Sequence, residues 1–166
     1  MIIAITGTPG TGKTATAKRL ARLLNFNCVG LNKLIKQKKL YSSFDKKRKS
    51  YVVDVKKFNK LKIKDDSIVD SHLSHFLKSV NVIFVLRCAP SALEKRLAKK
   101  KWNKDKIQEN VEAELIGIVA SEARQMHKKV YDIDTTRKNP SAVALLIAKV
   151  VKGSVKGNGK IIDWIK

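Results

Sequence analysis

The residues with the clearest chemistry form a short segment near the start of the chain. The segment matches the pattern G-x-x-x-x-G-K-[ST] and reads Gly7-Thr8-Pro9-Gly10-Thr11-Gly12-Lys13-Thr14. Its glycines let the backbone approach phosphate oxygens closely, and successive N–H groups there form a nest for an anion. The Lys13 ammonium can reach the β- and γ-phosphates of a nucleotide, and the Thr14 hydroxyl can ligate Mg²⁺. The segment therefore predicts a phosphate-binding loop that takes a nucleotide together with Mg²⁺.

A second set of candidate residues follows two apolar runs further along the chain. Asp70 ends the run 67–70, and a carboxylate at this place usually orients Mg²⁺ beside the loop threonine. A plain helix cap is the alternative interpretation of Asp70. His72 lies two residues later near the same edge and is a further candidate, although a lone histidine is more often structural. His75, one turn further, is interpreted as structural. Arg87 ends the strongly apolar run 81–86 and is predicted to lie at that edge too.

These residues must be positioned by strands and helices that alternate along the chain. Short apolar runs predict strands at 1–6, 26–29, 67–70, 81–86 and 130–134. Helical spacing predicts helices at 15–24, 31–40, 55–61, 71–77, 90–100, 105–126 and 139–151. A mobile loop is predicted at 41–51, and the tail 152–166 is expected to dock through its isoleucines and Trp164. The alternation predicts an α/β fold with a parallel sheet and a ligand at the carboxyl ends of its strands.

Length and composition limit the class of protein. With 166 residues, the chain is predicted to be a single domain, residues 1–166. No apolar run approaches the roughly 20 residues that span a bilayer, and the chain enters the phosphate-binding loop without a leader segment. A cytoplasmic protein without membrane contact is therefore expected. Cys28 and Cys88 lie far apart in apolar surroundings and are expected to be small core residues.

The charge of the chain is strongly positive and uneven. It has 36 Lys and Arg against 14 Asp and Glu, for a net charge of +22. The segment 33–64 carries 13 basic residues and two acids, and 95–106 carries seven basic residues and one acid. Such blocks predict an anionic partner, with nucleic acid first. A lysine surface that only keeps the protein soluble is the alternative.

Five segments, in this order and spacing, resemble the adenylate kinase isoenzyme 6 family, also called the coilin-interacting nuclear ATPase family. They are 6–14, 69–72, 84–87, 93–97 and 108–114, and the resemblance covers nearly the whole chain. Its most specific parts are the phosphate-binding loop and the Asp-x-His element at Asp70 and His72.

The resemblance implies a fold, an activity and partners. The fold is a three-layer P-loop kinase fold, in which a five-stranded parallel sheet is flanked by helices. The activity is transfer of phosphate from ATP, with Mg²⁺, to AMP and other nucleoside monophosphates, together with ATP hydrolysis. The implied role is maturation of the small ribosomal subunit, with a ribosomal protein of the uS11 type and ribosomal RNA as partners. Eukaryotic relatives are nuclear.

The resemblance also assigns roles to residues and segments of this chain. A monophosphate-binding region is expected at about 30–53 and a short lid at about 99–109. Contacts to ATP are assigned to Gly10, Thr11, Gly12, Lys13, Thr14, Ala15 and Lys100. Contacts to the monophosphate are assigned to Lys36, Arg87 and Arg96. Mg²⁺ is assigned to Thr14 and Asp70, and catalysis to Lys13, Asp70, His72 and Arg87.

The chain departs from the family at two cationic positions. Lys100-Lys101-Trp102 stands where the family usually has Arg-Gly-aromatic, and Lys36 stands at a family arginine. An ammonium cannot make the bidentate phosphate contact of a guanidinium. Weaker or less selective kinase activity is therefore expected, with more weight on Arg87 and Arg96. Lysines in place of family acids favour contact with RNA at Lys38, Lys46 and Lys47.

Three functions follow from these observations. The first is a nucleoside monophosphate kinase with ATPase activity. The second is an ATP-driven assembly factor whose kinase activity is incidental, which the basic segments and the replaced arginines favour. The third is another P-loop small-molecule kinase, such as a shikimate or gluconate kinase, against which the Asp-x-His element and the lid spacing argue.

Overall fold

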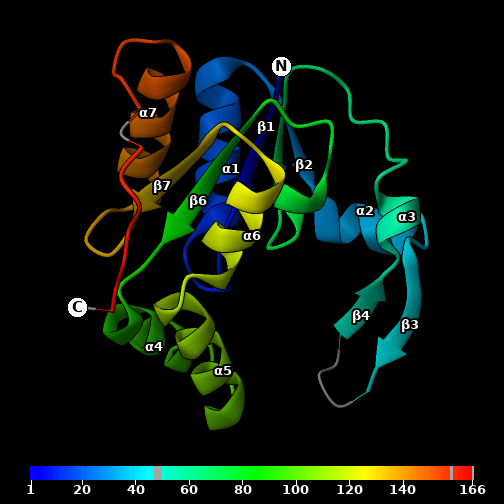
Figure 1. Cartoon of the computed structure of the whole chain (residues 1–166), viewed down its shortest axis with the longest axis vertical. Helices are drawn as coiled ribbons and strands as arrows, with labels where there is room; N and C mark the ends of the chain where they lie inside the picture. Colours follow the sequence, from blue (N-terminus) through cyan, green and yellow to red (C-terminus); the bar gives the residue numbers. More distant parts are fainter. Residues whose placement is uncertain (47–49, 158, 166) are drawn as a thin grey trace.

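A computed structural model of the chain describes residues 1–46, 50–157 and 159–165. At its centre lies a five-stranded sheet with the order β2-β5-β1-β6-β7, in which all neighbouring strands are parallel (Figure 1). The strands are β1 (Ile2–Thr6), β2 (Asn27–Gly30), β5 (Ser67–Asp70), β6 (Val82–Arg87) and β7 (Val130–Asp134). The register pairs Ile5 with Asp70, so β5 delivers its terminal carboxylate beside the end of β1.

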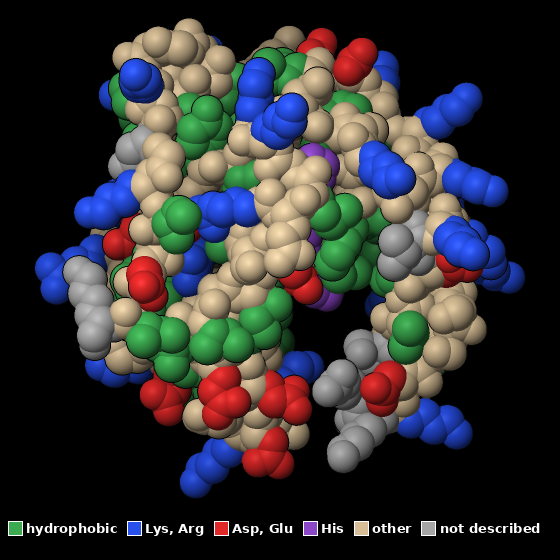
Figure 2. All heavy atoms as spheres, in the orientation of Figure 1, with side chains coloured by type: hydrophobic (Ala, Val, Ile, Leu, Met, Phe, Trp, Pro, Cys, Tyr) green, Lys and Arg blue, Asp and Glu red, His purple; other side chains and the backbone are tan. Residues whose placement is uncertain are grey.

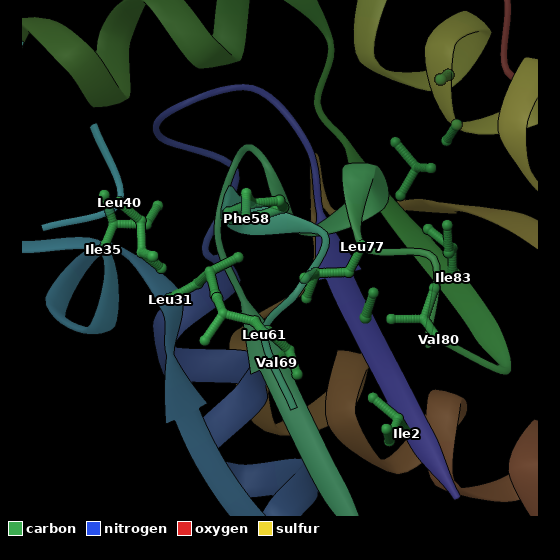
Figure 3. Packing of buried hydrophobic residues seen from close by; sticks show 14 residues of the cluster. Ile2, Leu31, Ile35, Leu40, Phe58, Leu61, Val69, Leu77, Val80 and Ile83 are labelled. Carbon is green, nitrogen blue, oxygen red and sulfur yellow. The ribbon is translucent and has the colours of Figure 1, made fainter. Parts of the chain in front are cut away.

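Helices cover both faces of this sheet. Ile3 and Ile5 of β1 face α1 (Lys13–Leu24) and α7 (Pro140–Val151) in one apolar cluster. Ile2 and Ala4 belong to the other cluster, with α2 (Leu31–Gln37), α3 (Val55–Phe58) and α6 (Ile118–Met126), part of which Figure 3 shows. Consecutive residues of a strand point to opposite faces, which is why the central strand is apolar throughout. The three-layer α/β class predicted from the sequence is confirmed.

Two helices and a hairpin extend beyond the carboxyl ends of the strands. The helices α4 (Pro90–Ala98) and α5 (Lys104–Leu115) pack through Leu93 and Leu97, with Trp102 and Ile107 against them. The hairpin joins β3 (Tyr41–Asp45) to β4 (Ser50–Val53). Figure 2 shows a hollow between the lobe of α4 and α5 and this hairpin.

The hairpin corrects one prediction. The segment 41–51 was expected to be a mobile loop because it is polar and basic, but its ends form antiparallel strands in which Phe44 pairs with Tyr51. The rings of Phe44 and Tyr51 meet edge to face with their centroids 5.1 Å apart. The ring centroids of Tyr41 and Tyr51 are 4.3 Å apart. Such aromatic pairs across strands stabilise a hairpin that the polar residues alone do not predict. Residues 47–49 of the expected loop lie outside the described part.

Two predicted helices are also different in the structure. The helix expected at 105–126 is two helices, because Gly117 adopts φ 68° and caps α6 between them. The helix expected up to Leu77 is only a 3₁₀ turn, η1 (Ser74–Phe76), and no side chain caps it. Instead, the Ser71 hydroxyl accepts a hydrogen bond from the Leu73 N–H at 3.1 Å.

The remaining differences concern a cysteine and the tail. Cys88 is buried as predicted, but Cys28 is exposed on the edge strand β2. The tail docks at Ile162 and Trp164 without forming a regular turn, and residues 158 and 166 lie outside the described part. Within the described ranges, no helix is long and apolar enough to cross a membrane.

Candidate active site

The phosphate-binding loop lies between β1 and α1, where its shape depends on glycine. Gly7 adopts φ 134°, and a Cβ atom there would collide with the carbonyl oxygen of Leu86 on β6. Gly12 caps α1 with φ 94°, in open space, so it is required for its backbone conformation only. α1 therefore begins at Lys13 and directs its N-terminal N–H groups into the loop, as an anion site requires.

Lys13 is held ready inside the loop. Its Nζ donates a hydrogen bond to the carbonyl oxygen of Thr8 at 3.0 Å. Burial lowers the pKa of Lys13 to about 8, an effect that Lys100 adds to and the carboxylates of Asp70 and Glu114 oppose. At neutral pH the group remains a cation. A bound polyphosphate would supply the counter-charge that this desolvated ammonium needs.

Thr14 and Asp70 offer a pair of oxygen atoms at the mouth of the loop. The Thr14 hydroxyl donates to Oδ2 of Asp70 at 2.5 Å, although 56 residues separate them. The Asp70 carboxylate is buried and acidic, and both groups are hard oxygen ligands of the kind that Mg²⁺ prefers. Because Mg²⁺ keeps several waters and binds through one or two protein oxygens plus phosphates, this pair fits the ion. Among the described residues, no cluster of three His, Cys, Asp or Glu forms a metal cage.

A cleft of about 650 Å³ joins these groups to α5. His72, Asn32 and Ser71 line one wall of this cleft, and the Ser71 hydroxyl donates to Oδ1 of Asn32 at 2.8 Å. Burial and the nearby Lys13 lower the pKa of His72 to about 4. The imidazole is therefore neutral at pH 7. The predicted ATP-site residues that line the cleft are Gly10, Gly12, Lys13, Thr14, Ala15 and Lys100.

A second hollow of similar size, about 650 Å³, shares Asn32 and His72 with the first. It is lined mainly by apolar and aromatic side chains, among them Phe44, Tyr51 and Phe76. Among the described residues that line it, Lys36 is the one Lys or Arg, with Nζ 5.4 Å from the ring centre of Tyr51. The structure thus places Lys36 apart from the residues of the phosphate-binding loop, in a hollow lined by aromatic side chains.

The helix α5 contributes residues to the cleft that the sequence reasoning did not single out. Lys106, Glu109 and Asn110 of α5 line the phosphate cleft beside Trp102, and Lys106 Nζ lies 4.2 Å from the centre of that indole ring. Their spacing of three and four residues is that of one helix face, which is the signal that could have identified them. Lys101, at the family's glycine position, adopts the left-handed φ of 56°.

Arg87 lies buried, away from both hollows. Its side chain is only 2% exposed and does not line either hollow. Its Nε donates to Glu114 at 2.8 Å, and its NH1 lies 3.4 Å from Asp132 and 2.8 Å from the carbonyl oxygen of Ile162. These buried partners and the carbonyl oxygen of Glu114 occupy most of the N–H donors of the guanidinium, and the substrate contact assigned to Arg87 stays a prediction.

Arg96 is also placed differently from the prediction. Its NH2 donates to the carbonyl oxygens of Thr135 and Thr136 at 2.6 and 3.1 Å. It lines a third hollow, of about 360 Å³, that shares Gly10, Thr11 and Gly12 with the loop but no residue with the Lys36 hollow. Arg96 therefore lies beside the phosphate-binding loop and away from the hollow that contains Lys36.

Comparisons with known proteins identify relatives of this chain. Residues 3–117 match the family described as AAA domain. A protein of Pyrococcus abyssi named "Putative adenylate kinase" is 39% identical over 165 residues, which cover 99% of this chain and 91% of that one. A protein of the same name from Halobacterium salinarum is 38% identical over 167 residues, covering 99% and 98%.

Solved structures with low identity share the fold. YorR of Bacillus subtilis, in complex with phosphorylated GDP, superposes with a TM-score of 0.66 at 17% identity, covering 93% of this chain and 97% of that one. Shikimate kinase from Acinetobacter baumannii, in complex with shikimate, gives 0.64 at 16% identity, covering 93% and 94%. The chain therefore belongs to the AAA-domain family and to the family of archaeal proteins named "Putative adenylate kinase".

Proposed function

We propose that the protein transfers the γ-phosphate of ATP to a nucleoside monophosphate, with AMP as the first candidate. One observation carries this proposal: a phosphate cleft and an aromatic hollow with a lysine lie side by side and share Asn32 and His72. A transferase for two nucleotides needs two such sites in contact, whereas an ATPase needs only the first. The names of the archaeal relatives support the same activity.

The donor site is proposed to be the phosphate cleft. The backbone N–H groups from Gly10 to Ala15 and the Lys13 ammonium would hold the ATP phosphates. Thr14 and Asp70 would hold Mg²⁺, which supplies charge neutralisation on the phosphate oxygens when bound. The hollow beside Arg96 and Thr135 adjoins the same glycines and has space for part of the donor nucleoside.

The acceptor site is proposed to be the aromatic hollow, within the expected monophosphate region 30–53. Tyr51 and Phe44 offer ring faces and edges to a nucleobase, and Lys36 offers a cation to its phosphate. The γ-phosphorus would form a bond to an acceptor phosphate oxygen while its bond to the β-phosphate oxygen of ADP breaks. The neutral imidazole of His72 lines both hollows and could accept a hydrogen bond from water, or donate its ring N–H to an oxygen of the acceptor phosphate.

The proposed lid, 99–109, consists of the turn after α4 and the first half of α5. Lys100 and Lys106 bring two ammonium groups to the open side of the cleft. Movement of this segment toward the hairpin would exclude water from the transferring phosphate. With no monophosphate bound, water would take its place, and slow ATP hydrolysis is the expected second activity.

The test is to follow ADP formation with Mg²⁺ and ATP in the absence and presence of AMP. The proposal predicts that AMP raises the rate of ADP formation. If AMP leaves the rate unchanged, the kinase function is wrong and an ATPase remains. Parallel reactions with GMP, CMP, UMP and shikimate decide between a monophosphate kinase and another small-molecule kinase, since phosphorylation of shikimate alone would favour the latter.

A second candidate function is an ATP-driven role in maturation of the small ribosomal subunit, as the subfamily resemblance implies. The observation that favours it is the charge of +22, with exposed lysines on α2 and α3 and at Lys46 after β3. Contacts to a uS11-type protein and to ribosomal RNA are the proposed interactions. Binding to a ribosomal RNA fragment should weaken steeply as salt rises from 50 to 200 mM, whereas salt-independent binding or none at low salt would exclude it.

A further inference from the structure

One carboxylate lies under the phosphate-binding loop without belonging to either hollow. Glu114 is 1% exposed and is the one fully buried side chain of α5, all of whose residues are described. Its Oε2 accepts a hydrogen bond from the Thr8 hydroxyl at 2.6 Å. Its Oε1 accepts from Arg87 Nε at 2.8 Å, from the Cys88 N–H at 3.0 Å and from Trp164 Nε1 at 3.1 Å. Burying a charge is favourable only when it is paired in this way.

The Thr8 end of this cluster controls the shape of the phosphate-binding loop. The carbonyl oxygen of Thr8 accepts hydrogen bonds from Lys13 Nζ at 3.0 Å and from the Thr11 hydroxyl at 2.9 Å. Thr8 is therefore fixed at both its side chain and its backbone, and two loop side chains take their positions from it. A shift of the Thr8 hydroxyl would move the carbonyl that holds Lys13.

The other end of the cluster is the lid. Lys106, Glu109 and Asn110, which line the cleft, lie on the same helix as Glu114, four to eight residues before it. α5 ends directly after Glu114, and the next turn passes through Gly117, whose added Cβ would lie 3.4 Å from the Arg87 guanidinium. The last turn of α5 is thus tied to the sheet, while its first turns reach over the cleft.

We propose that Glu114 is a positioning residue, which fixes the phosphate-binding loop through Thr8 and anchors the fixed end of the lid helix. A bound polyphosphate would break the hydrogen bond between Lys13 and the Thr8 carbonyl. Because the Thr8 hydroxyl is bonded to Glu114, this change would affect the same carboxylate that anchors α5. The alternative is a cluster that only fastens the tail to the sheet. That α5 acts as a lid rests on the proposed function, but the test below needs only nucleotide binding.

The test uses isothermal titration of the full chain with Mg²⁺ and the non-hydrolysable ATP analogue AMP-PNP. Thr8→Val removes the hydroxyl at nearly constant volume, whereas Thr8→Ser keeps the hydroxyl and removes only the methyl group. Because a hydrogen bond to a charged group contributes roughly 1.5–3 kcal/mol, affinity should fall about tenfold or more in Thr8→Val and stay within about twofold of the wild type in Thr8→Ser.

The matched control is Thr6→Val. Thr6 is equally buried, immediately before the loop, but its hydroxyl pairs with Nδ1 of His75 at 3.0 Å. This variant should lose thermal stability as Thr8→Val does and yet bind AMP-PNP normally. Wild-type affinity in Thr8→Val, or an equal loss in Thr6→Val, would overturn the proposal.

A double-mutant cycle identifies the partner. Glu114→Gln keeps the shape of the side chain, and its effect on affinity should not add to that of Thr8→Val, whereas additive effects would contradict the linkage. If Glu114→Gln does not fold, the Thr8 variants still decide. Failure of AMP to stimulate ADP formation in the wild type would refute the kinase function and leave these binding results valid.

Discussion

The Thr14 hydroxyl donates a hydrogen bond to the Asp70 carboxylate at 2.5 Å, where α1 begins and β5 ends beside the phosphate cleft. The pairing of Ile5 with Asp70 in the sheet fixes this meeting, because it sets where β5 stops relative to the loop. The two oxygens are the proposed site of Mg²⁺.

Asp70→Asn should leave the fold intact and impair the use of Mg²⁺. The amide keeps one oxygen but loses the charge that attracts the ion, so kcat should fall by about 10²–10³-fold, as for other electrostatic groups at a reacting phosphate. Steady-state rates at several Mg²⁺ concentrations measure this effect. Thr14→Ser, which keeps the hydroxyl, is the control and should retain most of the activity. An Asp70→Asn enzyme with normal kcat would limit the carboxylate to a structural role through its hydrogen bond with Thr14.

Lys36→Ala should weaken the acceptor and spare the donor. Within the described part of the chain, Lys36 supplies the one ammonium that lines the aromatic hollow, and a charged contact contributes roughly 1.5–3 kcal/mol. KM for AMP should therefore rise about tenfold or more while KM for ATP stays unchanged. Lys33→Ala, on the exposed side of the same helix, is the matched control. Equal changes in both KM values would mean that the hollow is not the acceptor site.

Arg87→Met should act on stability. It leaves Glu114 and Asp132 buried without this cation, and breaking such a pair costs about 3–5 kcal/mol. Urea unfolding measures the loss, and Arg22→Met, at an exposed position on α1, should change the free energy of unfolding by less than about 0.5 kcal/mol. Unchanged stability with a raised KM for AMP would restore Arg87 to the substrate site.

Stability should also depend on pH through His72. Its pKa is about 4 in the folded protein and near 6.5 when unfolded, so between these values the unfolded chain binds the extra proton. Protonation of His72 in the unfolded chain therefore lowers the free energy of unfolding as pH falls from about 6.5 to 4. Below about pH 4, His72 lowers the free energy of unfolding no further. Urea titrations of the wild type and His72→Gln over this range should show a shallower decline in the variant. Parallel declines would contradict the low pKa.

The sequence predicts the central sheet and the donor loop because both depend on local patterns. Apolar runs identify the five strands, and the loop motif identifies Lys13 and Thr14 without reference to the rest of the chain. The aromatic hairpin is less predictable, since its stability comes from Phe44 and Tyr51 facing each other across strands. The helix break at Gly117 carries a visible signal, because glycine commonly occupies the left-handed position at a helix end.

The role of Arg87 could not be read from the sequence for a physical reason. An arginine at the end of a strand is equally suited to a substrate phosphate and to a buried acid. Its partners Glu114 and Asp132 lie 27 and 45 residues away, on a helix and a strand whose packing no local pattern fixes. The burial of Glu114 could not be predicted for the same reason: its partners are distant in the sequence, and helical periodicity predicts that charged residues are exposed.

The fate of the γ-phosphate distinguishes a monophosphate kinase from an ATPase. Incubation with γ-³²P-labelled ATP, Mg²⁺ and AMP, followed by separation of the products, distinguishes labelled ADP from labelled inorganic phosphate. The account predicts that the label appears mainly in ADP, and that Lys13→Ala abolishes both products. Label that appears only in inorganic phosphate, at a rate that AMP does not change, would contradict it.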